Sequence, residues 1–137
     1  MFARGECLCG DIIISCEEKP IMSGCCHCAE CQRETGSAFA SLMIFPHHAV
    51  TFSGNFLTEY VHTGASGKKV SRRFCSKCGS SVGVWYEVTP DFMVVMAGIL
   101  KDKLKFNPSF DIYSEEALDW VTFIEGHRVY PRGFGST

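Results

Sequence analysis

Nine cysteines in a chain of 137 residues constrain this protein more than any other feature of its sequence. Four of them fall within GCCHCAEC at residues 24–31, and others form CLCG at residues 7–10 and CSKCG at residues 75–79. An odd number of cysteines cannot all pair within one chain, and CxC and CxxC spacings are those that tetrahedral zinc sites use. The sequence therefore predicts metal binding rather than a disulfide framework.

Length and composition predict one domain over residues 1–137, because 46% hydrophobic residues and eleven phenylalanines can build a single core. The longest apolar run, residues 93–100, is far shorter than the roughly 20 residues that cross a bilayer, so we expect no membrane span. Glu6 and Asp11 interrupt the N-terminal segment before any apolar stretch can form, which argues against a secretory signal and for a cytoplasmic protein. A net charge of −2 with scattered cations indicates no nucleic-acid partner.

Short segments rich in β-branched and aromatic residues recur along the chain, separated by Gly, Pro, Asn or Ser. This pattern predicts a mainly β, antiparallel domain. The expected strands are residues 11–16, 38–45, 50–52, 56–62, 70–74, 81–87 and 92–97. Two short helices are expected, at residues 29–35 and at residues 114–121, where Ser114 precedes two glutamates as an N-cap residue would. Residues 126–137 are rich in Gly, Pro and Arg, and we expect them to pack irregularly or fray.

Two separated cysteine pairs predict a structural zinc site. Cys75 and Cys78 lie three residues apart, and Gly79 after them can take the positive φ that closes a knuckle turn. A CxxC pair supplies only two ligands, so it needs a second pair. Cys7 and Cys9 supply that pair, because residues two apart on an extended segment point to the same side.

The central segment must then bind metal with its own residues, in one of two frames. Cys25, Cys28 and Cys31 form one frame; Cys26, Cys28 and Cys31 form the other, in which an extended segment leads into a helical turn. The second frame agrees better with the strand-like composition of the residues before Cys26. Three thiolates with an exchangeable fourth ligand are typical of catalytic zinc, whereas closure by Cys25 or His27 would make a structural site.

The order of these motifs resembles that of the glutathione-dependent formaldehyde-activating enzymes, also called S-(hydroxymethyl)glutathione synthases. The resemblance runs from about residue 7 to residue 120 and is carried by CLCG, CHCAEC followed by QRETGSAF, RRFCSKCGS, GIL and Trp120. It implies a zinc-bound antiparallel β-tent with one or two short helices. It also implies two zinc ions per chain, a structural one on Cys7, Cys9, Cys75 and Cys78 and a catalytic one on Cys26, Cys28 and Cys31.

The chain departs from this family pattern in its last third. Asp111, in KDKLKFNPSFDIY, stands where a His is common, and Ala117 and Leu118 replace an ordinary basic residue before the final Asp-Trp. None of these positions is a predicted zinc ligand.

The resemblance implies a zinc-dependent carbon–sulfur lyase-type enzyme. Such an enzyme would join formaldehyde or a related aldehyde to glutathione or another thiol as an S-hydroxymethyl adduct. Arginine forks match the carboxylates of glutathione, and a serine can donate a hydrogen bond to a peptide-like ligand. The candidate substrate contacts are therefore Arg33, Ser37, Arg72 and Arg73. The alternative is that the arginines contact no substrate and only offset the negative charge of the thiolates.

Two other interpretations stay open. The domain also resembles that of centromere protein V, which favours a non-catalytic, zinc-stabilised binding module. A redox or metal-buffering protein would use Cys25 and Cys26 as spare thiols. Cys16 fits a buried, unligated thiol, and His47 and His48 are expected in an exposed loop.

Overall fold

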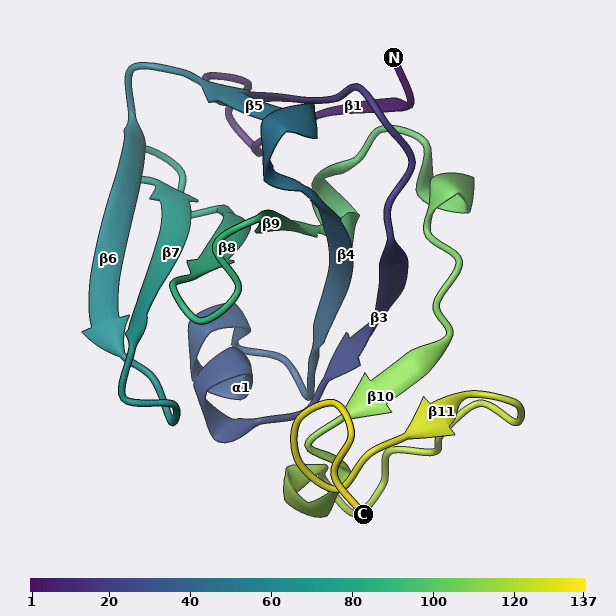
Figure 1. The fold of residues 1–137 in the computed structure, drawn as a ribbon. Helices are drawn as coiled ribbons and strands as arrows, with labels where there is room; N and C mark the ends of the chain where they lie inside the picture. Colours follow the sequence, from purple (N-terminus) through teal and green to yellow (C-terminus); the bar gives the residue numbers. More distant parts are fainter.

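The structure is a computed structural model that describes residues 1–137, apart from the side chain of Leu104. Its smaller sheet has three antiparallel strands in the order β1, β2, β5 (Figure 1). These strands are β1 (Ala3–Glu6), β2 (Ile13–Cys16) and β5 (Val50–Ser53). The small sheet lies at the end of the molecule that carries the N-terminus.

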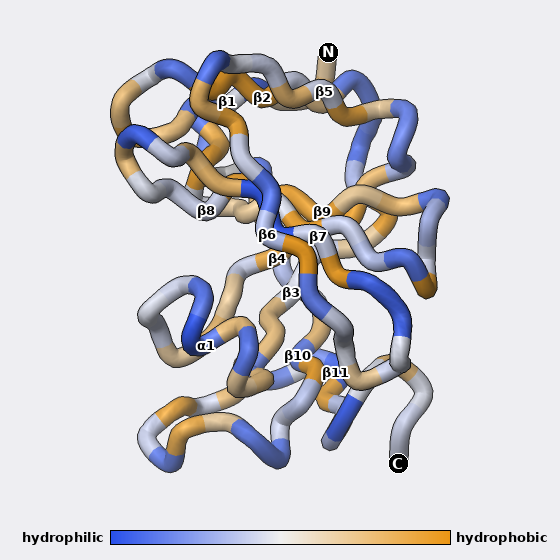
Figure 2. Tube along the Cα trace, turned by 90° about the vertical axis from the view of Figure 1, so that its left-hand side faces the viewer, coloured by the Kyte–Doolittle hydropathy of each residue, from blue (hydrophilic) through white to orange (hydrophobic). Residues whose placement is uncertain are grey.

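The larger sheet has eight strands in the order β11, β10, β3, β4, β9, β8, β7, β6. Its strands are β3 (Met22–Cys26), β4 (Ala40–Pro46), β6 (Leu57–Thr63), β7 (Lys69–Cys75), β8 (Ser81–Tyr86), β9 (Phe92–Met96), β10 (Phe110–Ile112) and β11 (Arg128–Val129). The helical segments are α1 (Ala29–Thr35), η1 (His47–Ala49), η2 (Ala97–Ile99), η3 (Lys103–Lys105) and η4 (Ser114–Glu116). In both views α1 lies away from the small sheet, in the half of the molecule that holds β10 and β11 (Figures 1 and 2).

The predicted mainly β fold is confirmed, and each of the seven expected strands matches an observed one to within two residues at either end. The large sheet departs from an antiparallel arrangement at one edge, where β10 runs parallel to both β3 and β11. The sequence also gave no signal for β1, because Ala3 and Gly5 on its buried side are weak strand formers. Gly5 is required there, since a Cβ atom at this position would lie 2.5 Å from the carbonyl oxygen of Ile99.

The predicted helix at residues 114–121 is wrong beyond its first turn. Only η4 forms, and Ala117 after it is extended. Ser114 does not cap the turn, because the N-cap position is Tyr113, whose side chain makes no capping hydrogen bond. The expected irregular tail contains the short strand β11, and the Phe134 ring packs 4.9 Å from that of Phe110.

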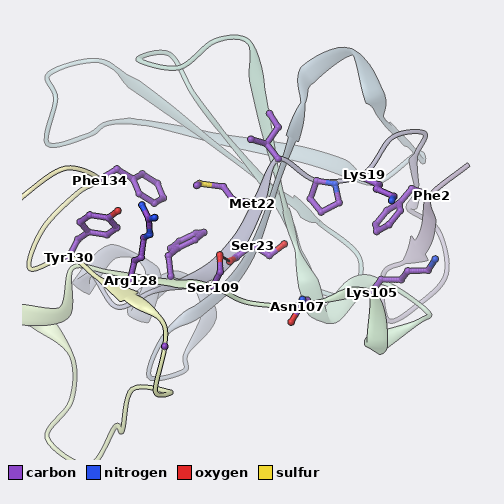
Figure 3. Close-up of a pocket in the computed structure, with 14 residues that line it drawn as sticks. Phe2, Lys19, Met22, Ser23, Lys105, Asn107, Ser109, Arg128, Tyr130 and Phe134 are labelled. Carbon is purple, nitrogen blue, oxygen red and sulfur yellow. Dashed lines mark hydrogen bonds between the residues drawn. The ribbon is translucent and has the colours of Figure 1, made fainter.

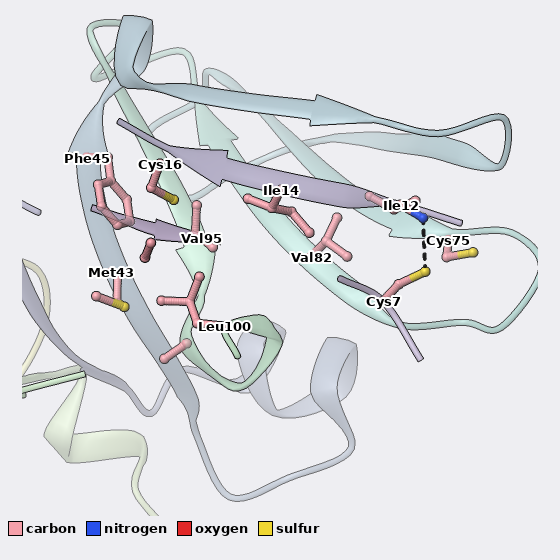
Figure 4. Packing of buried hydrophobic residues seen from close by; sticks show 12 residues of the cluster. Cys7, Ile12, Ile14, Cys16, Met43, Phe45, Cys75, Val82, Val95 and Leu100 are labelled. Atoms are coloured by element: carbon pink, nitrogen blue, oxygen red, sulfur yellow. Dashed lines mark hydrogen bonds between the residues drawn. The ribbon is translucent and has the colours of Figure 1, made fainter. Parts of the chain in front are cut away.

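Buried side chains form two separate cores. The first lies between the small sheet and strands β4, β8 and β9, where Figure 2 shows hydrophobic colour along the chain; its labelled members in Figure 4 include Ile12, Ile14 and Phe45. The second lies among β3, β4, β9 and β10 and includes Leu42 and Phe110. Each core contains cysteines from one of the two predicted metal sites.

Helix α1 confirms the prediction for residues 29–35 and is limited at both ends by local chemistry. The Cys28 sulfur is its N-cap and accepts a hydrogen bond from the Cys31 N–H. Gly36 ends the helix in the left-handed region at φ 68°, where glycine is favoured. Within the described part of the chain, no helix is long and apolar enough to cross a membrane.

Candidate functional site

The first cysteine cluster joins the two sheets. Cys7 and Cys9 lie in the loop between β1 and β2, Cys75 ends β7, and Cys78 lies in the following turn. Their four sulfur atoms all lie within 4.8 Å of one another. The Cys7 and Cys9 sulfurs are 3.6 Å apart, and those of Cys9 and Cys75 are 3.8 Å apart.

These separations fit a tetrahedral zinc ion. Sulfur atoms at about 2.3 Å from one zinc ion lie about 3.8 Å from each other in a tetrahedron. Two tight turns produce the arrangement, with Gly10 at φ 84° and Gly79 at φ 80°. The Ile12 N–H donates to the Cys7 sulfur at 3.2 Å, and Figure 4 shows this bond beside Cys75. The cluster can therefore hold a metal ion with four protein ligands.

The second cysteine cluster lies where β3 leads into α1. Cys26 ends β3, Cys28 caps the helix, and Cys31 lies in its first turn. Their three sulfurs lie within 4.8 Å of one another, with Cys26 and Cys31 buried and Cys28 half-buried. This is the second of the two frames weighed from the sequence, an extended segment followed by a helical turn.

The two residues that would have closed this site do not join the three sulfurs. Cys25 alternates with Cys26 along β3 and therefore points to the other face of the sheet. His27 turns its Nε2 atom to Asp111, with 2.7 Å between Nε2 and Oδ1. Among the described residues, the cluster thus offers a metal ion three protein ligands and not four.

The second cluster concentrates negative charge, and the buried Arg72 lies against it. Hydrogen bonds from the Cys26 and Cys31 thiols, with the nearby Arg72 charge, lower the pKa of Cys28 well below its usual range. Burial opposes the charge of Arg72, but Tyr86, Cys31 and other groups raise its pKa, so the guanidinium stays charged. Arg72 therefore favours the thiolate form of Cys28 and offsets part of the negative charge that the three sulfurs can carry.

The four predicted substrate contacts do not form one group. Arg72 is 6% exposed and interacts with the second cluster, but its guanidinium also donates to Glu34 at 3.0 Å and to His62 at 2.9 Å. Arg73 alternates with it along β7 and forms an ion pair with Glu59 at 3.4 Å. The other two, Arg33 and Ser37, are exposed in and after α1.

The structure also reveals residues near the second cluster that the sequence did not single out as functional. Tyr113 packs against the core that contains Cys26 and Cys31. It is the one non-glycine residue with positive φ in the described chain, at 56°. Asp111 contacts both His27 and His127. The sequence marks Asp111 only as a departure from the family pattern, and it gives no indication of a role for His127.

A groove of about 620 Å³ lies apart from both clusters, and no cysteine lines it (Figure 3). Lys19 and Lys105 lie at one end of it and Arg128 lies toward the other, with Met22 between them, and Phe110 also lines it. His47 and His48 are exposed as expected, but they begin the short helix η1 instead of lying in a loop.

Comparison with known proteins assigns the chain to a family. The family described as "Glutathione-dependent formaldehyde-activating enzyme" matches residues 2–116. No curated protein matches the chain. A crystal structure of a Rhodobacter sphaeroides protein superposes with a TM-score of 0.58 at 21% identity, covering 72% of this chain and 87% of the other, and this likeness concerns the fold. Because the family match spans most of the sequence, the chain belongs to the glutathione-dependent formaldehyde-activating enzyme family.

Proposed function

We propose that the second cluster, Cys26, Cys28 and Cys31, is the catalytic zinc site of a carbon–sulfur lyase-type enzyme. Its substrates are formaldehyde or a related aldehyde and glutathione or another thiol, joined as an S-hydroxymethyl adduct. Family membership supports a glutathione- and formaldehyde-related activity in general. The observation that carries the proposal is that three sulfurs, one of them half-buried, converge without a fourth ligand among the residues that the structure describes.

The reaction needs no redox cofactor. The thiol sulfur forms a bond to the carbonyl carbon, the carbon–oxygen π pair moves to the oxygen, and that oxygen takes up the proton that the thiol has lost. A zinc ion with an exchangeable position would supply a thiol held as thiolate at neutral pH, where a free thiol of pKa about 8.5 is mostly protonated.

The residues of the chain provide the ligand set and its charge balance. Cys26, Cys28 and Cys31 offer three thiolates, and Arg72 brings one positive charge to them from β7. Arg72 already donates hydrogen bonds to Glu34 and His62. We therefore propose that it offsets the charge of the thiolates and does not bind the carboxylates of a substrate. Arg33 and Ser37, which are exposed, stay proposals for substrate contact, whereas Arg73 faces away from Arg72 along β7.

The first cluster, Cys7, Cys9, Cys75 and Cys78, is proposed as a structural zinc site, which gives two zinc ions per chain. Four sulfurs at tetrahedral spacing leave no position for a substrate. A metal content near one zinc per chain would contradict this assignment. The cytoplasmic location stays a prediction.

Exchange spectroscopy by NMR tests the activity. The protein is added to formaldehyde and glutathione at equilibrium with their adduct, and the exchange rate is compared with the spontaneous rate. We expect faster exchange with the native protein, no acceleration with Cys28→Ser, and retained acceleration with the neighbouring non-ligand variant Cys25→Ser. Exchange at the protein-free rate, with two zinc ions bound, would reject the lyase assignment and favour the binding module.

A further inference from the structure

His27, the residue between the first two ligands of the second cluster, is held on every side. Its N–H donates to the Ile112 carbonyl at 3.0 Å, and its own carbonyl accepts from Gln32 Nε2 at 2.8 Å. The ring is 1% exposed and lies between the rings of Phe39 and Phe123, each at a centroid distance of 5.2 Å. The backbone that joins Cys26 to Cys28 therefore has little freedom.

The ring of His27 is fixed by a buried carboxylate that serves two histidines. Asp111 Oδ1 lies 2.7 Å from His27 Nε2, and Asp111 Oδ2 lies 2.8 Å from His127 Nδ1. The exposed fractions of the three side chains are 1%, 6% and 8% for His27, Asp111 and His127. Burying a carboxylate is costly unless it is paired, and here both oxygens are paired.

The hydrogen-bond pattern fixes the tautomer of His27. An ionised carboxylate only accepts hydrogen bonds, so His27 must carry a proton on Nε2. Its Nδ1 atom is buried and has no hydrogen-bond partner among the described residues. The ring is thus oriented by Asp111 alone among polar groups.

The same three residues connect the elements around the cluster. Asp111 lies in β10, which pairs in parallel with β3 so that Asp111 stands opposite Cys25. His127 directly precedes β11, which pairs with β10 on its other side. The network therefore ties the end of β3 to two strands from the C-terminal third of the chain.

We propose that Asp111 and His127 are positioning residues for the second cluster. Acting through His27, they hold the segment between Cys26 and Cys28 so that both sulfurs face one metal ion. The inference rests on the proposed function to the extent that the second cluster binds zinc. It assigns a role to Asp111 at the position where the chain departs from the family pattern.

The test measures zinc release from the purified, zinc-loaded protein to an excess of a chromophoric chelator. Cys28→Ser, which lacks a ligand of the second cluster, identifies the phase that belongs to that site. We compare Asp111→Ala with Asp111→Asn, whose amide can accept from His27 and donate to His127. Asp119→Ala, at an exposed position in the same part of the chain, is the control.

We expect Asp111→Ala to speed zinc release from the second site by up to about 10-fold, the lower end of the effect of losing a residue that is hydrogen-bonded directly to a ligand, because Asp111 acts through His27. Asp111→Asn should release zinc from the second site at close to the native rate. Release from the first site should be unchanged in both Asp111 variants. If Asp111→Ala does not fold, His127→Ala is measured in its place, with a smaller expected effect. In the native protein, imidazole ¹⁵N shifts should show His27 protonated on Nε2.

The outcomes separate the inference from the function on which it rests. If Asp111→Ala speeds zinc release from both sites equally, and Asp111→Asn does not restore the native rate, Asp111 has only a general structural role. Release from Asp111→Ala at the native rate would also overturn the positioning role, while leaving the lyase proposal intact. A native protein that binds zinc only at the first cluster would overturn both.

Discussion

Single residues decide how closely the strands around the second cluster can approach. Gly24 in β3 stands opposite Phe110 in the parallel strand β10. A Cβ atom on Gly24 would lie 2.4 Å from the Phe110 ring, a distance that real Cβ contacts do not reach. The aromatic ring therefore occupies the space that a side chain would need, two residues before Cys26 of the second cluster.

Gly24→Ala should lower the free energy of unfolding by about 1–3 kcal/mol, because Phe110 or the β10 backbone must move. Gly98→Ala is the matched control, since a Cβ atom there meets nothing within 4 Å. Urea denaturation of the zinc-loaded variants measures the difference. Equal stability of the two variants would show that β10 is not packed against β3 as described.

Cys16 makes the stability of the protein sensitive to alkaline pH. Burial, and to a smaller extent the charge of Glu17, raises the pKa of this thiol to about 11 from an ordinary value of 9.0. The unfolded chain therefore loses the Cys16 proton first as pH rises, which favours unfolding. The contribution is intact below pH 9 and is lost progressively up to about pH 11.

Cys16→Val should remove that decline. The stability difference between native protein and variant should shift in favour of the variant by up to about 3 kcal/mol between pH 8 and pH 11. Thermal or urea unfolding across this pH range measures it. A pH-independent difference would show that the thiol is ordinary.

At the scale of elements, α1 depends on what it contacts. A seven-residue helix is too short to be stable alone, so its caps and its tertiary contacts must hold it. Arg72 of β7 supplies such a contact, donating to Glu34 at 3.0 Å and pairing with Glu30 at 3.5 Å. The ion pairs connect β7 to α1, the helix that contains Cys31 of the second cluster.

Glu34→Gln should reduce stability by about 1–3 kcal/mol, because it leaves the buried Arg72 with a weaker partner. The control is Glu59→Gln, whose half-exposed partnership with Arg73 should be worth less than about 1 kcal/mol. Denaturant unfolding compares them at neutral pH. A larger loss for Glu59→Gln would contradict the assigned role of Arg72.

The two cysteine clusters differ in how much of the whole molecule they connect. The first joins residues from the β1–β2 loop to the β7–β8 turn, and so fastens the small sheet to the large one. The second involves only the end of β3 and the start of α1. Loss of metal should therefore have unequal consequences at the two sites.

Cys78→Ser should unfold the domain or lower its melting temperature severely, since structural zinc contributes folding free energy directly. Cys26→Ser should mainly empty one site and leave a folded protein with about one zinc per chain. Circular dichroism with metal analysis of both variants makes the comparison. Equal loss of structure in both would count against the division into structural and catalytic sites.

The grouping of the cysteines into two clusters could be predicted because most of them come in closely spaced pairs or triplets. Short-range patterns indicate these pairs: CxxC followed by glycine predicts the turn at Cys75 and Cys78, and CxC predicts that Cys7 and Cys9 point to the same side. Asp111 and His27 are 84 residues apart, and no local pattern indicates that they meet. Arg72 and Arg73 are both predicted as substrate contacts, although alternation along a strand sends neighbouring side chains to opposite faces of the sheet.

The edge of the large sheet was harder to predict for a related reason. All three residues of β10 are buried, including Asp111, so the strand lacks the alternation by which half-buried strands are recognised. Its parallel partners depend on where the long connection after β9 returns to the sheet. The predicted helix at residues 114–121 likewise ends after η4 because Ala117 is extended, a conformation that the high helix propensity of alanine does not indicate.

The wide separation of the ligands in the first cluster has a consequence during protein synthesis. The ligands of the second cluster are all present once residue 31 has left the ribosome, whereas those of the first are incomplete until residue 78 has followed. A nascent chain therefore contains the three cysteines of the second cluster before its two sheets can be joined, whereas the proposed positioning residues Asp111 and His127 are made last. With zinc at both proposed sites, zinc supply would act at two successive stages of maturation, of which the first cluster determines whether the two sheets are joined.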